Sequence, residues 1–295
     1  MLKPCVITEY VDPSLSRALP QIADLGFETV ELHTIDGTPV EGCTDEQLVD
    51  SKVLLDRYHM HVANIASTIF FDARLFPTDD LGDATTDYPC ASGDIDDHLA
   101  HLRRAIDAAK VLGSPSVRVF PFRYPNNRPT PFGTAVDREA IEGHLRQALQ
   151  VAREGDVTIV LENCPHTHLP KGKMTLEVVK AIDDPRLRLL WDPANSYRAV
   201  VDNVPERYRD TTLLEELDEV LPFVAHVHLK NYRYDPEVQP KPFVHVPLGE
   251  GDIDFQALLS LLSERGYDGA VSLEPEVGRE GSLKSMRTLV EMIGA

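Results

Sequence analysis

The sequence predicts an α/β fold, a single (β/α)8 TIM barrel domain that spans residues 1–295, from three observations. Short apolar runs alternate with amphipathic segments along the whole chain, and this unit repeats eight times. The apolar runs are continuous, which is typical of parallel strands that are covered on both faces. No glycine-rich fingerprint follows the first run, so closure into a barrel is favoured over an open, doubly wound sheet.

The elements follow in strict alternation. The apolar runs predict strands at residues 5–8, 29–32, 61–66, 116–120, 158–161, 187–191, 224–227 and 270–273. Helical spacing of apolar residues predicts helices at 14–25, 45–58, 95–112, 137–153, 175–182, 212–221, 254–265 and 282–293. Glycines directly after several helices supply the expected stop signals, at Gly26, Gly113 and Gly155.

Three segments that follow strands are long, whereas the turns that follow helices are short. They run over residues 69–94, 121–136 and 231–252. In a barrel, loops of this kind lie over the C-terminal face and build the substrate pocket there. The first of them is rich in Asp, Thr and Pro, and both a lid and a merely mobile loop remain open for it.

Composition excludes several classes of partner. The net charge is −19, with 48 acidic and 29 basic residues, which argues against nucleic acid and against an anionic membrane surface. The four cysteines are scattered and form no C-x-x-C pair, so a reducing compartment is expected. No apolar leader and no run of ~18 apolar residues is present, and we therefore expect a cytoplasmic protein without a membrane span.

Four residues of metal-ligand type each stand at the end of a predicted strand: Glu162, Asp192, His228 and Glu274. A single buried carboxylate could belong to a salt bridge, but four such residues on successive strands favour a shared divalent metal. Three carboxylates and one imidazole suit Mn²⁺ best, and Mg²⁺, Co²⁺ or Zn²⁺ also fit. Such an ion polarises a carbonyl while neighbouring carboxylates move a proton, which predicts isomerisation or epimerisation of a sugar or cyclitol.

The sequence also resembles the xylose isomerase-like TIM barrel superfamily, most closely its sugar (phosphate) isomerase/epimerase branch. The resemblance begins near GFETVEL at 26–32 and covers nearly the whole chain. Its further motifs are LEN at 161–163, WDPAN at 191–195, HVHLKNYR at 226–233, PLGEGDID at 247–254 and GAVSLE at 269–274. The resemblance implies that Glu162, Asp192, His228 and Glu274 hold the metal. It further implies that Glu162 and Glu274 remove and return a proton through an enediolate.

Further residues are predicted to contact the substrate. The resemblance implies that Arg233 binds substrate oxygens, and Lys230 is its basic neighbour, although the two could equally form a solvated pair. His168 and Asn195 stand where the family has a glutamate and a histidine, so both depart from the free-ketose pattern. His33 and Ser67 lie at or near the ends of the second and third strands, a position that suits pocket lining.

Competing functions remain open at this level. A lyase of the same fold, similar to an inosose dehydratase, begins with the same proton abstraction. A DNA-repair endonuclease is disfavoured by the acidic charge, and a non-catalytic sugar-binding barrel by the presence of all four ligand-type residues. Barrels of this kind often pair through loops and helices, so a homo-oligomer is compatible with the sequence.

Overall fold

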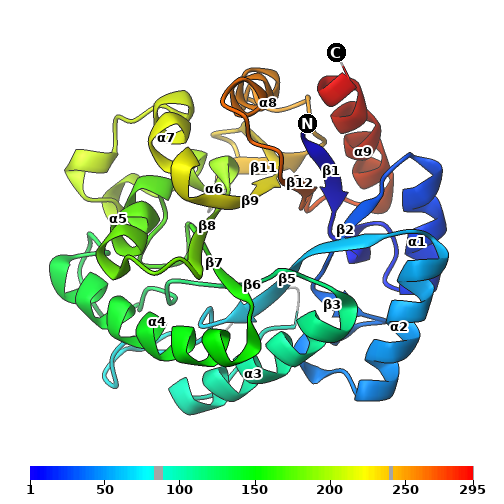
Figure 1. Cartoon of the computed structure of the whole chain (residues 1–295). Coiled ribbons are helices and arrows are strands. Elements are labelled where there is room, and N and C mark those ends of the chain that lie inside the picture. The colour runs from blue at the N-terminus through cyan, green and yellow to red at the C-terminus, as the bar shows by residue number, and fades with distance from the viewer. Residues whose placement is uncertain (83–88, 239–241, 295) are drawn as a thin grey trace.

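A ring of parallel strands surrounded by helices forms the architecture of the computed structural model, which describes residues 1–82, 89–238 and 242–294 (Figure 1). The strands pair in the order β1-β12-β9-β8-β7-β6-β5-β2. A parallel bridge between Ile7 and Glu31 joins the two ends of that order, next to β1 and in β2. The barrel strands are β1 (Lys3–Val6), β2 (Thr29–Leu32), β5 (His61–Ile69), β6 (Ser116–Val119), β7 (Thr158–Glu162), β8 (Leu187–Trp191), β9 (Val224–Leu229) and β12 (Ala270–Leu273).

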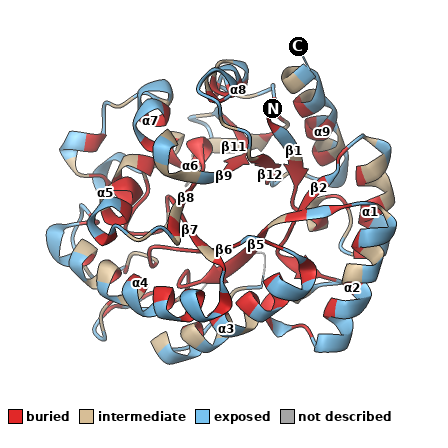
Figure 2. Ribbon diagram, viewed as in Figure 1, coloured by how far each residue is buried: buried red, intermediate tan, exposed pale blue. Residues whose placement is uncertain are grey.

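The helices form the outer layer of the barrel, as Figure 1 shows. They are α1 (Leu15–Asp24), α2 (Asp45–Arg57), α3 (Ile95–Leu112), α4 (Ala135–Gly155), α5 (Gly172–Ile182), α6 (Pro193–Tyr197), α7 (Leu213–Val220), α8 (Phe255–Glu264) and α9 (Arg279–Gly294). Short 3-10 helices lie at Thr8–Tyr10, Val40–Gly42, Val201–Asn203, Glu206–Tyr208 and Leu221–Phe223. The faces of the outer helices that meet the strands are buried and the opposite faces are exposed (Figure 2).

The predicted (β/α)8 barrel is confirmed, and all eight predicted strands are present. The boundaries differ most at β1, which begins two residues earlier than predicted, and at β5, which continues to Ile69. The short helix α6 was not predicted, because five residues are too few to show helical periodicity.

Local capping explains where several helices begin. The N-cap side chains of α2, α3, α4 and α7 each accept a backbone N–H three residues on, and that third residue binds back to the cap. These capping boxes satisfy backbone donors that a helix start would otherwise leave unpaired. The capping boxes of α3 and α4 thereby fix the N-termini of these two helices, each of which follows a long loop.

Two small hairpins extend the loops over the C-terminal face. One pairs β3 (Thr34–Ile35) with β4 (Thr38–Pro39), and the other pairs β10 (Asn231–Tyr234) with β11 (Phe243–Val246). The predicted loop at 231–252 is therefore partly a β-hairpin, which Tyr232 and Phe243 stabilise by an edge-on ring contact.

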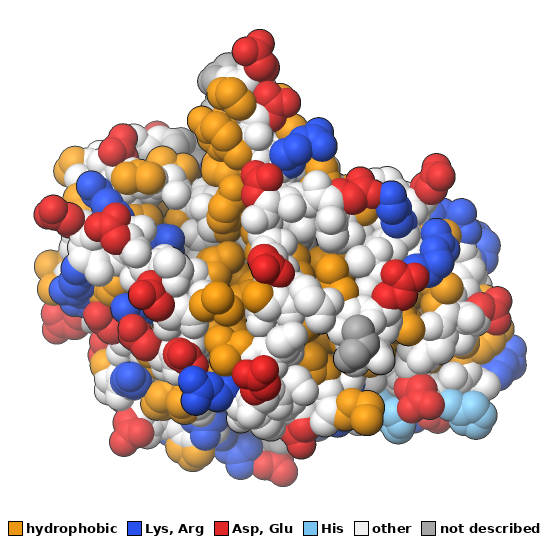
Figure 3. Space-filling view, turned by 90° about the horizontal axis from the view of Figure 1, so that it is seen from above, with side chains coloured by type: hydrophobic (Ala, Val, Ile, Leu, Met, Phe, Trp, Pro, Cys, Tyr) orange, Lys and Arg blue, Asp and Glu red, His pale blue; other side chains and the backbone are white. Residues whose placement is uncertain are grey.

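Part of the long-loop prediction lies outside the described residues. Residues 83–88 belong to the predicted loop at 69–94, for which both a lid and a mobile loop were considered, and residues 239–241 belong to the predicted loop at 231–252. Among the described residues, no helix is both long and apolar enough to cross a membrane. Figure 3 shows one face of the molecule, on which acidic and basic side chains are interspersed without a continuous basic patch.

Candidate metal centre and substrate pocket

The four predicted ligand residues converge at the C-terminal end of the barrel. Glu162 ends β7, Asp192 follows β8, His228 lies near the end of β9, and Glu274 follows β12. Each offers a ligand atom, and these atoms all lie within 4.8 Å of one another. Asp192 is also the N-cap of α6, where its Oδ1 accepts the N–H of Asn195 at 2.9 Å, so the turn fixes its orientation.

The donor atoms at this point fit a divalent cation. Asp192 Oδ2 and His228 Nδ1 are buried, and neither has a hydrogen-bond partner within the described part of the chain. Lys230 Nζ lies 3.1 Å from Asp192 Oδ2 as an ion pair. Buried polar atoms without a hydrogen bond are costly, and carboxylate and imidazole donors suit Mn²⁺, Mg²⁺ or Zn²⁺. The residues present therefore match a metal site.

A buried carboxylate beneath the centre, Glu31 on β2, orients His228. Glu31 Oε2 lies 2.9 Å from His226 Nε2 and 3.0 Å from His228 Nε2, and Glu31 Oε1 accepts Asn64 Nδ2–H at 2.7 Å. Because Nε2 of His228 faces this carboxylate, Nδ1 is the nitrogen left for the site. The sequence analysis missed Glu31, and its place at a strand centre gave no signal beyond a charge in an apolar run.

Arg118 on β6 connects the two glutamates. Its Nη1 donates to Glu162 Oε2 at 2.8 Å and to Glu274 Oε1 at 3.4 Å, and all three side chains are buried. Asn195 Nδ2 donates to Glu162 Oε1 at 3.0 Å. The guanidinium and the amide therefore fix both carboxylates in one place and supply positive charge beside them.

Lys230 closes the cluster from the side of β9. Its Nζ donates to Glu274 Oε2 at 2.6 Å and to Glu276 Oε1 at 3.0 Å. Glu276 has a left-handed backbone conformation with φ of 47°, and this turn brings its carboxylate back to the lysine. Lys230 is thus part of the candidate centre, and the solvated basic pair considered from sequence does not describe it.

The two glutamates differ in acidity although they share their neighbours. Burial raises the pKa of Glu162 to about 7, although the charge of Arg118 opposes the rise. Burial acts on Glu274 as well, but Lys230 and His228 overcome it and hold the pKa of Glu274 well below its usual range. A pair with separated pKa values is the arrangement in which one carboxyl group donates a proton and the other accepts one.

A cavity of about 990 Å³ opens over the centre, at the C-terminal ends of the strands. Its lining includes His33, Asn195 and Lys230 together with Glu162 and Glu274. His33 Nδ1 lies 2.8 Å from Glu9 Oε1, so a second histidine–carboxylate pair faces the same space.

Three further residues that were predicted to bind substrate lie outside that lining. Ser67 is buried and donates to the carbonyl of Arg118, and His168 is buried beside Asp137, with 3.6 Å between its Nδ1 and Asp137 Oδ2. Arg233 lies on β10 with an exposed side chain. Their contact with substrate stays a prediction that their positions do not support.

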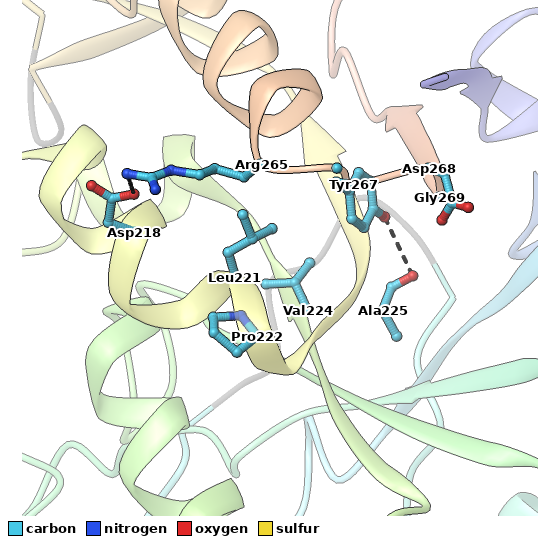
Figure 4. Close-up of a pocket in the computed structure, with 10 residues that line it drawn as sticks. Asp218, Leu221, Pro222, Val224, Ala225, Arg265, Tyr267, Asp268 and Gly269 are labelled. Atoms are coloured by element: carbon cyan, nitrogen blue, oxygen red, sulfur yellow. Dashed lines mark hydrogen bonds and ion pairs between the residues drawn. The ribbon is translucent and has the colours of Figure 1, made fainter.

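A second cavity, of about 540 Å³, lies at the opposite end of the barrel (Figure 4). It is lined where β9 and β12 begin, and the figure shows Asp218 paired with Arg265 and Tyr267 bound to the carbonyl of Ala225. Barrel enzymes carry their active sites at the C-terminal ends of the strands. The cavity above the candidate metal centre is therefore the candidate active site.

Comparison with known proteins identifies the family. A model of the xylose isomerase-like TIM barrel family matches residues 19–292, and the chain belongs to this family. An uncharacterized protein of Methanocaldococcus jannaschii is 26% identical over 288 residues, which covers 96% of this chain and 86% of that protein. The inosose isomerase of Halalkalibacterium halodurans is 24% identical over 299 residues, covering 97% and 94%. The inosose dehydratase of Yersinia enterocolitica is 29% identical over 150 residues, 46% of each chain.

Solved structures share the fold. The IOLI protein, whose crystal structure has a binding zinc atom, matches with a TM-score of 0.71 and 18% identity over 99% of this chain and 98% of that one. A D-tagatose 3-epimerase-like protein matches with a TM-score of 0.68 and 24% identity over 99% and 97%. Distant relatives of this chain are thus isomerases, epimerases and dehydratases, and its clustered carboxylates and histidines form a candidate divalent metal site.

Proposed function

We propose that the chain is a divalent-metal-dependent isomerase or epimerase that moves a proton beside the carbonyl of a sugar or cyclitol. One observation carries this proposal: Glu162 and Glu274 share Arg118 and His228 as neighbours, inside a cluster of four ligand-type residues. Two carboxyl groups at one carbon can invert its configuration, because one accepts the proton and the other returns one. Relatives that include an inosose isomerase and a 3-dehydro-D-guloside 4-epimerase support this reading.

The two glutamates take opposite roles in the proton transfer. Glu274 is ionised by its cationic neighbours and is the group that removes the proton. Glu162, which shares the Arg118 guanidinium with Glu274, is the group that returns a proton to the same carbon. Arg118 contacts both and stabilises the negative charge that develops on the enediolate oxygens.

Glu162, Asp192, His228 and Glu274 would hold the metal, with Mn²⁺ as the proposed ion. When bound, a divalent ion supplies Lewis acidity that makes the neighbouring C–H more acidic. Glu31 orients the ring of His228, and Lys230 positions the carboxylates of Glu274 and Asp192 by direct contact.

A lyase reaction is the second candidate, and the partial similarity to an inosose dehydratase favours it. Elimination begins with the same proton removal by Glu274, after which a β-hydroxyl group departs as water. Lys230 Nζ, a buried cation next to Glu274, could supply the proton that such a leaving group needs. The two reactions differ in whether the substrate keeps all its oxygens.

A single experiment separates these outcomes. Protein supplied with Mn²⁺ is incubated in D₂O with free ketohexoses, their 6-phosphates and inososes, and NMR follows C–H signals and products. Exchange of one substrate C–H for C–D without loss of water supports isomerisation or epimerisation. Loss of water supports the lyase, and a panel in which no compound exchanges a C–H or loses water would overturn both.

The variant Glu274→Gln tests the role of the proposed base. We expect exchange to fall by roughly 100-fold or more, because general base catalysis typically contributes that much. Metal content and the thermal transition are measured on the same sample, since Gln keeps one oxygen ligand. Exchange at the wild-type rate in a folded, metal-containing variant would exclude the two-glutamate mechanism.

A further inference from the structure

One corner of the active-site cavity contains an arginine without a carboxylate partner. Arg198, which directly follows α6, lines the cavity together with His166 and His245. Its Nη2 donates to His166 Nε2 at 2.8 Å, and its guanidinium lies 5.0 Å above the ring of Tyr232. Both contacts are to groups without a negative charge, and the second is a cation–π contact.

The other cations of the cavity lining are paired with carboxylates. Arg118 contacts Glu162 and Glu274, Arg123 Nη1 lies 3.1 Å from Asp72 Oδ1, and Lys230 contacts three carboxylates. Among the described residues, no carboxylate oxygen lies within ion-pair distance of Arg198. Arg198 is half-buried at the cavity wall, and its guanidinium therefore presents a positive charge to the cavity without a direct ion pair.

Two neighbouring polar atoms are also without partners. The hydroxyl of Tyr232 and Nδ1 of His245 have no hydrogen-bond partner among the residues that the structure describes, and Tyr232 is fully buried. The same is true of Arg198 Nε. The β10–β11 hairpin brings two of these groups together, because Tyr232 and His245 are cross-strand partners with ring centroids 4.3 Å apart. These groups can therefore donate or accept hydrogen bonds to a polar group at the corner that Arg198 and His245 line.

We propose that this corner, which Arg198 and His245 line and Tyr232 supports from beneath the guanidinium, binds a carboxylate group of the substrate, which makes the substrate a keto sugar acid or its cyclitol counterpart. The inference rests on the proposed function for the position of the reacting carbonyl. The corner joins the metal centre through Glu276, which contacts both Lys230 Nζ at 3.0 Å and His245 Nε2 at 3.3 Å. One substrate can therefore reach both sites within the same cavity.

The charge balance favours a carboxylate over a phosphate. Arg198 supplies one positive charge, and His245 adds none near neutral pH, because burial lowers its pKa to about 4. A phosphate monoester carries about −1.5 to −2 charges at pH 7, and Glu276 already adds a negative charge nearby. A carboxylate carries a single charge and matches the planar guanidinium.

The test compares ligands that differ at one carbon. D-Fructuronate has a carboxylate at C6, D-fructose has a hydroxymethyl group there, and D-fructose 6-phosphate has a phosphate. D-Tagaturonate and D-tagatose form a second pair. Dissociation constants are measured by calorimetry with the Mn²⁺-supplied protein. We expect each uronate to bind about 10- to 100-fold more tightly than its ketose, the range of a charged hydrogen bond.

Variants assign the preference to Arg198. Arg198→Met should abolish the advantage of the uronate, and Arg198→Lys should keep part of it, since Lys retains the charge without the planar fork. Arg123→Gln is the matched control, because Arg123 lines the same cavity but is paired with Asp72, and it should keep the full advantage. Equal affinities in each pair, a preference for the phosphate, no binding by any compound, or a uronate advantage that survives in Arg198→Met would each overturn the inference.

Exchange in D₂O, measured on the same compounds, keeps this inference separate from the proposed function. Exchange of a substrate C–H without a uronate preference would leave the proposed function standing and remove the carboxylate subsite. A uronate preference that depends on Arg198, without any exchange, would support the subsite and count against the proposed reaction.

Discussion

Replacement of Glu31 by Gln tests the support beneath the candidate metal centre. Three donors converge on this carboxylate: Nε2 of His226, Nε2 of His228 and Nδ2 of Asn64. Asn64 cannot turn its amide around without loss, because its Oδ1 accepts from Ser116 at 2.7 Å. Either orientation of a Gln at this position therefore sets its NH₂ group against another donor.

The expected magnitudes follow from these contacts. Two charge-assisted hydrogen bonds of about 1.5–3 kcal/mol each are weakened, and we expect the free energy of unfolding to fall by about 3 kcal/mol. Loss of a carboxylate behind a ligating histidine typically costs about 10- to 100-fold in metal affinity. That factor corresponds to about 1.4–2.7 kcal/mol at His228, whose Nδ1 is then no longer held toward the other ligands.

Calorimetric titration with Mn²⁺ and urea denaturation measure the two quantities on the Glu31→Gln protein. Glu216→Gln is the matched control, because Glu216 is also buried and accepts Trp191 Nε1–H at 2.9 Å, and Trp191 is not one of the four ligand-type residues. The control should lose stability and keep the wild-type affinity for Mn²⁺. A folded Glu31→Gln protein that binds Mn²⁺ as tightly as the wild type would refute the reasoning.

Three further predictions concern stability. His98 is buried and burial lowers its pKa to about 4, so the unfolded chain takes up a proton below pH 6.5 while the folded chain stays neutral. Between pH 7 and pH 4.5 the wild type should therefore lose about 2–3 kcal/mol more than His98→Asn in urea denaturation, and equal losses would contradict this. Gly172→Ala places a Cβ 2.7 Å from Trp191, which should cost about 1–3 kcal/mol, and an unchanged thermal transition would exclude the clash. Mn²⁺ at 100 times its dissociation constant should stabilise the chain by about 2.7 kcal/mol, whereas Asp192→Ala should remove most of this gain.

The barrel could be predicted because each strand is a short apolar run, and the last four runs each end in a residue of metal-ligand type. Parallel strands in a barrel bring those ends to one face, so the convergence of Glu162, Asp192, His228 and Glu274 follows from their order in the chain. The long helices could be predicted for a similar reason, since their periodicity extends over many residues.

Residues that act through tertiary contacts could not be found in this way. Glu31 sits inside a strand, and only the folded barrel shows that it faces the histidines of β9 on the far side of β1 and β12. The β10–β11 hairpin determines which residue of β10 faces the interior. Side chains alternate along the strand, so Tyr232 is buried and Arg233 is exposed. Arg198 follows a five-residue helix, and its missing carboxylate partner is visible only in the structure.

The most direct measurement is the position of a manganese ion in a crystal of this protein soaked with Mn²⁺, located by anomalous scattering. We predict one strong peak within bonding distance of Glu162, Asp192, His228 Nδ1 and Glu274. A peak at another place, or no peak at these four side chains with manganese in excess, would contradict the proposed metal centre.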